Sequence, residues 1–388
     1  MLAFLRVQNF RAHRDFALEN FQNPEIITGP NGSGKTSLLE AIYICLRGKS
    51  WRSNFAEILR KDSQNFDNVI ASGREQPSED LPNNPSDFRE NPSTWWRIDL
   101  ILANETNKSR ETRTVKFLAN SENLEAARGG FAASRLPNPQ KLFEIDGQVS
   151  ARLPRKYFKP VILFEPGDLQ LLYGSPARRR DFFDHFISQI SLSHQTNLNK
   201  FSRILKQRNN LLKSGFATPE NLFVWDVQFA DLAEKIIEAR AEFAQKIDEK
   251  LTKNYQIIAK NSDQISLKYL AKTPSRAQIL RDLKTDFSRG FLTTKFGPQT
   301  DDYKFSLNSR AAKTHASRGE NRTIIFATLA AQTEILNEFF AEPVYLLFDD
   351  IDSELDSIHR ANLYQNPVFA KNILIATTIH SRNSSIRL

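Results

Sequence analysis

Residues 29–36 read Gly29-Pro30-Asn31-Gly32-Ser33-Gly34-Lys35-Thr36 and fill every fixed position of the G-x-x-x-x-G-K-[ST] pattern. The apolar pair Ile26-Ile27 precedes this stretch, and a run with helical spacing over 37–43 follows it. A glycine-rich turn between a strand and a helix can point successive backbone N–H groups at phosphate oxygens. The following helix adds the positive end of its dipole. The pattern therefore predicts a phosphate-binding loop rather than an ordinary strand-to-helix turn.

The chemistry of this loop predicts ATP and Mg²⁺ as cofactors. Lys35 is expected to reach the β and γ phosphates and to take part in catalysis, and the Thr36 hydroxyl is expected to ligate Mg²⁺. The residues predicted to contact the nucleotide here are Gly29, Pro30, Asn31, Gly32, Ser33, Gly34, Lys35, Thr36 and Ser37.

An apolar run over 344–348 ends in two carboxylates, Asp349 and Asp350. We expect this strand to lie beside the phosphate-loop strand, which would bring Asp349 to the metal ion. Asp350 would then orient or deprotonate the attacking water, as a catalytic base. Taken alone, the run would better fit a buried strand followed by an acidic loop, and it is the phosphate loop that favours a metal site.

A second set of motifs follows the order found in ATP-binding-cassette ATPases. Ser317 and Gly319 precede a long amphipathic helix, and this loop would grip the γ phosphate held by another subunit; the plainer interpretation is a capping box between Ser317 and Glu320. Residues 353–356 read Ser-Glu-Leu-Asp, and Asp356 is predicted to contact the nucleotide. His380, after another buried strand, is a candidate sensor of the γ phosphate, or else an ordinary surface histidine.

Composition favours a cytoplasmic protein that binds a polyanion. The 388 residues carry a net charge of +8, and residues 175–296 alone hold 21 Lys/Arg and 13 Asp/Glu. A basic segment of this kind indicates nucleic acid, although a solvated helix face would look similar. No apolar run is long enough to span a membrane, and residues 1–5 read as a strand rather than a signal peptide. The single cysteine, Cys45, is expected in the core, and a reducing compartment fits.

The pattern along the chain predicts an α/β fold in three segments. Residues 1–174 are expected to form the first part of an ATPase head, with the phosphate loop and an antiparallel β subdomain that has strands at 68–72, 94–103, 112–119 and 142–145. Residues 175–296 are expected to form a helical hairpin lobe, with helices at 177–213 and 226–260 and a shorter one at 276–289. Residues 297–388 would complete the head. Loops are expected at 75–93 and 120–140.

Several of these stretches together resemble the RecF family of bacterial ATPases. They are Asn9-Phe10-Arg11, residues 29–43 with 48–52 after them, residues 171–184 (LLYGSPARRRDFFD) and residues 349–356 (DDIDSELD). The chain departs from the family at 297–302, which read GPQTDD where Gly-Pro-His-Arg-Asp-Asp is typical, and at 317–321.

The resemblance implies a P-loop ATP-binding-cassette head with an inserted helical lobe, and a nucleotide contact for Arg11. It further implies a weak DNA-stimulated ATPase of DNA replication, repair and the SOS response. Such a protein forms an ATP-dependent homodimer, binds gapped, single-stranded or duplex DNA, and cooperates with RecR and RecO to load RecA. The alternatives are another DNA-associated cassette ATPase, or a slowly hydrolysing, nucleotide-gated DNA scaffold.

The DNA contact is predicted on the helical lobe. The residues are Lys200, Arg203, Lys206 and Arg208, and helical spacing places Lys200 beside Arg203 and Arg203 beside Lys206. Part of the cluster at 178–180 is expected to bind acidic residues inside the protein instead, with Asp181 and Asp184 as the nearby candidates.

Overall fold

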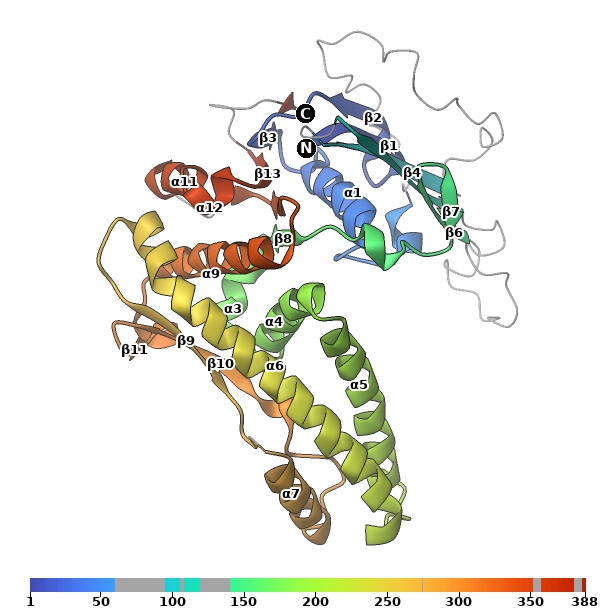
Figure 1. Ribbon diagram of the computed structural model, residues 1–388, viewed down its shortest axis with the longest axis vertical. Coiled ribbons are helices and arrows are strands. Elements are labelled where there is room, and N and C mark those ends of the chain that lie inside the picture. Colours follow the sequence, from blue (N-terminus) through green and yellow to red (C-terminus); the bar gives the residue numbers. More distant parts are fainter. Residues whose placement is uncertain (60–94, 105–107, 119–139, 274, 352–356, 380–385) are drawn as a thin grey trace. The chain divides into compact units, whose positions relative to one another are not determined.

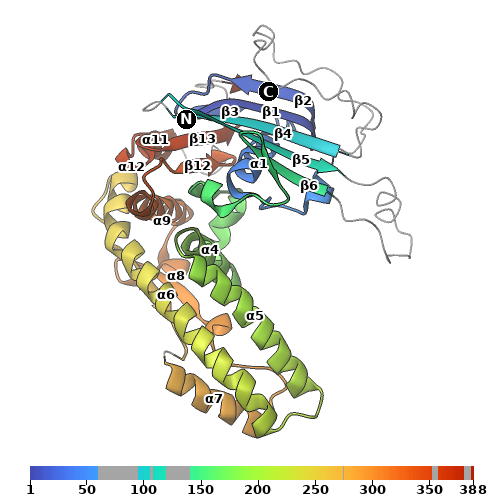
Figure 2. The ribbon, with the colours of Figure 1, turned by 45° about the vertical axis from the view of Figure 1, so that its right-hand side comes forward.

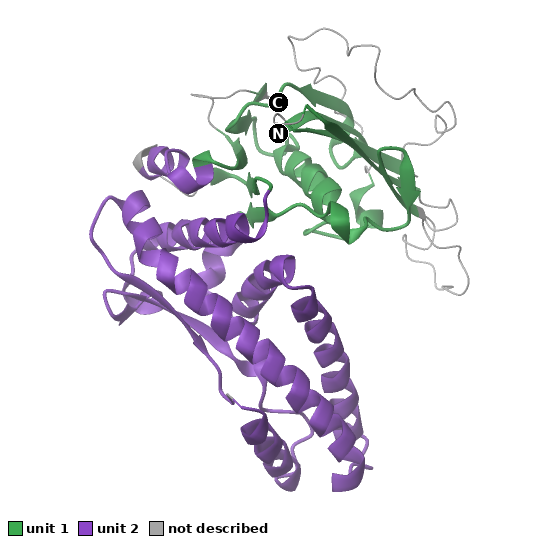
Figure 3. Cartoon of the chain, in the orientation of Figure 1, with its two compact units in different colours: residues 1–165, 342–354, 370–388 green, residues 166–341, 355–369 purple. Residues whose placement is uncertain are grey.

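The computed structural model describes residues 1–59, 95–104, 108–118, 140–273, 275–351, 357–379 and 386–388 (Figure 1). The chain forms two compact units (Figure 3). We call residues 1–165, 342–354 and 370–388 the phosphate-loop unit, and residues 166–341 and 355–369 the helical unit. Residues 297–341, which the sequence placed in the head, belong to the helical unit, and the division into three segments stays a prediction.

A five-stranded parallel sheet carries the phosphate loop. Its order is β14 (Ile386–Arg387), β3 (Glu25–Thr28), β13 (Ile373–Thr378), β12 (Tyr345–Phe348) and β8 (Val161–Phe164). Every residue of β12 and β13 is buried, as expected for apolar strands covered on both faces. Because β13 lies between β3 and β12, the expectation that the carboxylate strand lies beside the phosphate-loop strand is wrong.

A six-stranded antiparallel sheet forms the other layer of this unit. Its order is β2 (His13–Glu19), β1 (Leu2–Phe10), β4 (Trp95–Ala103), β5 (Arg110–Leu118), β6 (Gln140–Ile145) and β7 (Gln148–Ser150). The predicted β subdomain is therefore present, except that its first strand, at 68–72, falls outside the described residues, as do 75–93 and most of 120–140. Asp146 (φ 47°) and Gly147 (φ 80°) make the turn between β6 and β7, in the left-handed conformation that a two-residue hairpin requires.

Helix α1 (Lys35–Arg47) occupies the core between the two sheets (Figure 2). Its apolar residues form an unbroken run over 41–46 and so occupy every side of that part of the helix, and all residues of the helix but Thr36 are buried. Gly48 ends the helix with a left-handed φ of 71°, and its N–H donates to the Ile44 carbonyl at 2.8 Å. Cys45 lies within this core, where burial raises the pKa of its thiol.

The helical unit is built on long helices with a small sheet. The main helices are α4 (Pro176–Ile190), α5 (Leu192–Lys213), α6 (Pro219–Ala259), α7 (Arg276–Ser288) and α9 (Arg318–Phe339). The sheet has the order β11 (Arg310–Ala311), β10 (Asp302–Leu307), β9 (Ile265–Leu270). Short helices are α3 (Gln170–Tyr173), α8 (Ala312–His315), α11 (Ser357–Tyr364) and α12 (Pro367–Ala370). Single 3₁₀ turns lie at Phe55–Ile58 and Arg155–Tyr157 in the phosphate-loop unit, and at Pro166–Leu169 and Pro298–Thr300 in the helical unit.

Local capping explains where the predicted hairpin differs from the observed one. The helix is interrupted at Ser191, whose hydroxyl accepts a hydrogen bond from the His194 N–H and caps the start of α5. The single helix predicted over 177–213 is therefore two helices, α4 and α5. Helix α6 begins at Pro219, seven residues before the prediction, because Thr218 and Asn221 form a capping box. Helices α5 and α6 then run side by side as the predicted hairpin (Figures 1 and 2).

Buried arginines connect the elements of this unit. Arg179 pairs with Asp302 at 2.6 Å, and Arg180 donates to the carbonyl of Asp301 at 2.7 Å. Arg179 and Arg180 are thus bound inside the protein by residues of the GPQTDD stretch rather than by Asp181 or Asp184, whereas Arg178 lies 3.9 Å from Asp168. Asp184 instead pairs with Arg240 at 2.7 Å.

Arg208 belongs to this buried set, and the prediction that it contacts DNA is wrong. Its side chain is fully buried, donates to Asp226 at 2.6 Å and to the Thr294 hydroxyl at 2.8 Å, and so has no access to a phosphate backbone. Residue 208 follows Lys206 by two positions, which turns it to a different face of α5, the one that packs against α6.

Replacement of Arg208 by Gln should destabilise the helical unit, because it leaves the Asp226 carboxylate without its partner in a largely dry site. We expect a loss of about 3–5 kcal/mol in the free energy of unfolding, measured by chemical denaturation. Lys206→Gln, on the exposed face of the same helix, is the control and should change it by less than about 0.5 kcal/mol. Equal stabilities of the two variants would contradict the buried ion pair.

Candidate functional site

The phosphate loop adopts a conformation that its glycines permit. Gly32 and Gly34 have φ values of 84° and 94°, where other residues are strained. A Cβ on Gly34 would also stand 2.4 Å from Nε2 of His13, so the position is closed to any side chain. The Ser37 N–H donates to the Gly34 carbonyl at 2.9 Å and starts α1 directly after the loop.

Lys35 lies folded back along the loop. Its ammonium donates to the carbonyls of Gly29 at 2.7 Å and Pro30 at 2.9 Å. Burial lowers the pKa of Lys35, while the carboxylates of Asp350 and Asp349 act in the opposite direction. A cation that is partly desolvated at the mouth of a loop gains from a further anion, which is what a triphosphate supplies.

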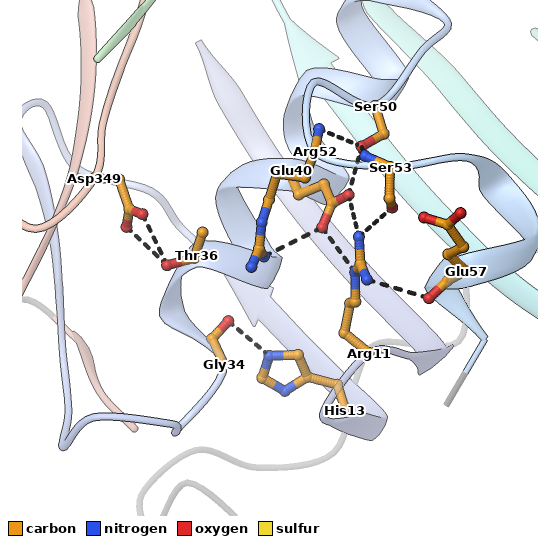
Figure 4. A network of polar contacts seen from close by, with 10 residues as sticks. All are labelled: Arg11, His13, Gly34, Thr36, Glu40, Ser50, Arg52, Ser53, Glu57 and Asp349. Carbon is orange, nitrogen blue, oxygen red and sulfur yellow. Dashed lines mark hydrogen bonds and ion pairs between the residues drawn. The ribbon is translucent and has the colours of Figure 1, made fainter. Parts of the chain in front are cut away.

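Thr36 and Asp349 meet, as the sequence predicts, although their strands are not neighbours. The Thr36 hydroxyl lies 3.0 and 2.8 Å from the two carboxylate oxygens of Asp349 (Figure 4). Both groups present hard oxygen atoms, the ligand type that Mg²⁺ prefers. Adjacent ligands of an octahedral Mg²⁺, each about 2.1 Å from the ion, lie about 3 Å apart, so the observed spacing fits this ion.

Thr377 completes this arrangement and was not singled out from the sequence. It lies on β13, between β3 and β12, and its hydroxyl donates to Asp349 at 2.7 Å. The same oxygen accepts a hydrogen bond from the backbone N–H of Asp350 at 2.8 Å. One fully buried hydroxyl therefore holds the carboxylate of Asp349 and the backbone of Asp350, and only the strand order reveals it.

Arg11 is held beside the loop by Glu40 of α1. Two guanidinium nitrogens lie 3.0 and 2.8 Å from the two Glu40 oxygens, and a third contact joins Arg11 to the Ser53 hydroxyl at 2.5 Å (Figure 4). Glu40 is fully buried and also accepts from Ser50 at 2.6 Å, with Arg52 at 3.5 Å. The nucleotide contact predicted for Arg11 stays a prediction, and its position is set by this carboxylate.

His13 is a second residue that the sequence did not reveal. Its Nε2 lies 3.1 Å from the Gly34 carbonyl, and since a carbonyl oxygen only accepts, Nε2 carries the proton (Figure 4). Burial lowers the pKa of His13, which keeps the ring neutral. The ring fills the space that the missing side chain of Gly34 leaves.

In the helical unit, Ser317 caps α9. Its hydroxyl accepts from the Glu320 N–H at 3.2 Å, and its own N–H donates to the Glu320 carboxylate at 2.6 Å, so the capping box is present. A Cβ on Gly319 would meet no atom within 4 Å, and Gly319 does not have a positive φ. Neither close packing nor a positive φ within this chain requires a glycine at position 319.

The remaining candidates are the cations predicted to contact DNA and two predicted nucleotide-site residues. Lys200, Arg203 and Lys206 are exposed on α5, unlike Arg208. His380 and Asp356 lie outside the described residues. Within the described part of the chain, no helix has the length and hydropathy that a membrane span needs.

Comparisons with known proteins agree with this geometry. A family model described as "AAA domain" matches residues 5–295, more than half of the chain. A relative named "DNA replication and repair protein RecF", from Clostridium novyi (strain NT), is 26% identical over 382 residues, covering 96% of this chain and 92% of the relative. A relative of the same name from Streptococcus suis (strain 05ZYH33) is 27% identical over 397 residues, covering 99% and 95%.

Solved structures show the same fold. One described as "Structure of the recombination mediator protein RecF-ATPrS in RecFOR pathway" has a TM-score of 0.76 at 20% identity and covers 100% of this chain and 96% of that one. An Smc head bound to the C-terminal winged-helix domain of ScpA has a TM-score of 0.50 at 14% identity, covering 98% and 90%. The predicted fold class, an ATP-binding-cassette head with an antiparallel β subdomain and an inserted helical lobe, is confirmed. The chain therefore belongs to the AAA domain family, and its resemblance to the RecF family is confirmed.

Proposed function

We propose that this protein is an ATP-dependent DNA-binding protein of DNA replication and recombinational repair, which hydrolyses ATP slowly and acts in the cytoplasm. The observation that carries the proposal is the meeting of Thr36, Asp349, Thr377 and Asp350 at the phosphate loop. These residues are what a Mg²⁺-dependent phosphoryl transfer to water requires, and the relatives named above are replication and repair proteins.

The chain's own residues divide the work of hydrolysis. Lys35 and the loop N–H groups bind and orient the β and γ phosphates. Thr36 and Asp349 would hold Mg²⁺, which supplies charge neutralisation on the phosphate oxygens when bound. Asp350, whose backbone Thr377 fixes, orients the attacking water and takes its proton. Because a bound triphosphate adds charge near two carboxylates, its binding depends on Lys35 and on the metal.

ATP-dependent dimerisation extends this proposal to Ser317 and Gly319. Gly319 has open space around it, and a glycine without an internal reason fits a surface that something else approaches closely. The N-terminus of a 22-residue helix favours anions, so the γ phosphate bound by a second copy is a fitting occupant. His380, Asp356 and Arg11 complete the proposed nucleotide site.

DNA is the proposed polyanion, gapped, single-stranded or duplex. The exposed cations Lys200, Arg203 and Lys206 on α5 would contact phosphates and so bind without regard to sequence. RecR, RecO and RecA are proposed partners, because the similar solved structure is that of a recombination mediator protein of the RecFOR pathway.

Lys35→Ala and Asp350→Asn should separate binding from hydrolysis. Lys35→Ala should weaken binding of labelled ATP about 10- to 100-fold, because it removes charged hydrogen bonds to the phosphates. Asp350→Asn should bind ATP at the parent's affinity and slow its turnover about 100-fold or more, because the water loses its base. Lys49→Ala, an exposed lysine after α1, is the control. A parent that binds ATP but never hydrolyses it would favour a nucleotide-gated DNA scaffold.

Ser317→Arg should leave ATP binding to the single chain intact and prevent ATP-driven dimerisation. A large cation would fill the helix N-terminus where the other copy's γ phosphate is proposed to dock. Light scattering with and without ATP measures the mass, and Ser317→Thr keeps the cap and should dimerise. If Ser317→Arg reaches dimer mass with ATP, Ser317 serves only as a helix cap.

Replacement of Lys200, Arg203 and Lys206 by Gln should weaken binding to duplex DNA of any sequence. Each lost phosphate contact should flatten the dependence of log affinity on log salt by about 0.9. Affinity measured by anisotropy over a salt series gives the slope, and ATP binding should be unchanged. Lys250→Gln on α6, whose ammonium is already paired with Glu338 at 2.7 Å, is a control that removes a single lysine charge. If the triple variant keeps the salt dependence of the parent protein, these α5 cations do not contact DNA.

A further inference from the structure

Large apolar side chains are exposed at one end of the helical unit. Phe216 is 79% exposed, Phe223 64% and Leu292 60%, and Val224 and Phe291 are exposed as well. Soluble domains rarely gather several such side chains on their surface unless they bind something there. We call residues 206–224 and 284–295 the tip.

Hydrogen bonds hold the two segments of the tip together. Arg208 of α5 donates to the Thr294 hydroxyl at 2.8 Å, and the Asn209 side chain accepts from the Thr294 N–H at 2.8 Å. Figures 1 and 2 both show α7 lying beside the end of the hairpin where α5 turns into α6. The exposed apolar residues of the two segments therefore share one end of the unit.

The charge of the tip is almost all positive. Its exposed cations are Lys206, Lys213, Lys284, Arg289 and Lys295, and none of them forms an ion pair within the described part of the chain. Glu220 is the one exposed carboxylate of these two segments, since Asp286 is buried and accepts from the Lys295 N–H at 2.9 Å. Lys295 also lies over the ring of Phe291, with the ammonium 5.8 Å from its centre.

Exposed aromatic rings among unpaired cations are what a single-stranded nucleic acid binds: phosphates take the cations, and unpaired bases stack on the rings. Duplex DNA would use only the cations, because its base faces are already stacked on one another. Lys213 follows Lys206 by two helical turns on α5, so the tip continues the exposed cations proposed above to contact DNA.

We propose that the tip binds single-stranded DNA, with unpaired bases stacked on Phe216 and Phe223 and phosphates held by Lys213 and Lys295. This proposal rests on the proposed DNA-binding function and deepens it, since it assigns the unpaired strand of a gapped substrate to a surface that adjoins the exposed cations of α5 at residues 200–206 and differs from them by its aromatic rings.

The test compares aromatic with aliphatic truncation at the tip. The variants are Phe216→Ala/Phe223→Ala and, as the matched control, Val224→Ala/Leu292→Ala, which removes exposed apolar area that cannot stack on a base. Anisotropy with a labelled oligothymidylate and with a labelled duplex of equal length, over a salt series with ATP, gives affinity and slope. A third variant, Lys213→Gln/Lys295→Gln, tests the phosphates.

We expect the aromatic variant to lose about 10-fold or more in oligothymidylate affinity, with an unchanged salt slope and duplex affinity, and the aliphatic variant to match the parent. The lysine variant should flatten the slope on oligothymidylate by about 0.7 per contact. Parental oligothymidylate affinity in the aromatic variant would overturn the proposal. So would equal losses in both apolar variants, because removal of aliphatic side chains cannot remove base stacking. If the parent protein binds duplex DNA but not oligothymidylate, only the proposal for the tip is overturned. If it binds neither, the proposed DNA-binding function is overturned.

Discussion

The hydrogen bonds between the Thr36 hydroxyl and the Asp349 carboxylate join two segments that lie 313 residues apart in the chain, and the nucleotide site depends on them. They form across an intervening strand, β13, which carries Thr377 into the space between. The Thr377 hydroxyl has one proton, which it gives to Asp349, and lone pairs, which receive the N–H of Asp350. Asp350 has a left-handed φ of 48°, which costs a non-glycine residue roughly 1 kcal/mol, and the bond to Thr377 offsets part of that cost.

Pairing of β8 with β12 allows most of the helical unit, residues 166–341, to be inserted in the chain between two adjacent strands of the phosphate-loop sheet. Val161 of β8 lies opposite Tyr345 of β12, in register, so the two ends of the insertion return to neighbouring positions. Lys159 and Glu342 pair at 2.5 Å at the same place. Because the entropic cost of bringing the two ends of an insertion together grows slowly with its length, this insertion adds little to the cost of folding the phosphate-loop unit. The phosphate loop, Asp349 and Thr377 thus lie together in the phosphate-loop unit, while the surfaces proposed for DNA lie in the helical unit.

The sequence predicts best what depends on local chemistry. The phosphate loop, α1 and its glycine cap, the hairpin at Asp146 and the capping box at Ser317 each need a particular residue at a particular position, and all are found. The sequence could not predict the order of the strands within the sheet. The apolar runs that form β3, β12 and β13 carry no record of which lies in the middle, so the place of β13 and the role of Thr377 were out of reach. The same limit hid His13, whose relevance comes only from its contact with Gly34.

The basic excess of the chain shows how burial changes the meaning of charge. Residues 175–215 hold eight basic residues, but Arg179 and Arg208 are buried in ion pairs with Asp302 and Asp226. The four that are exposed all lie on α5, at 200, 203, 206 and 213. An arginine's planar, always charged group suits internal pairing with carboxylates, whereas lysine loses more on desolvation and stays at the surface. Three of those four are lysines. The exposed positive charge of this segment therefore comes from four side chains rather than eight, and these follow one another along α5 into the tip.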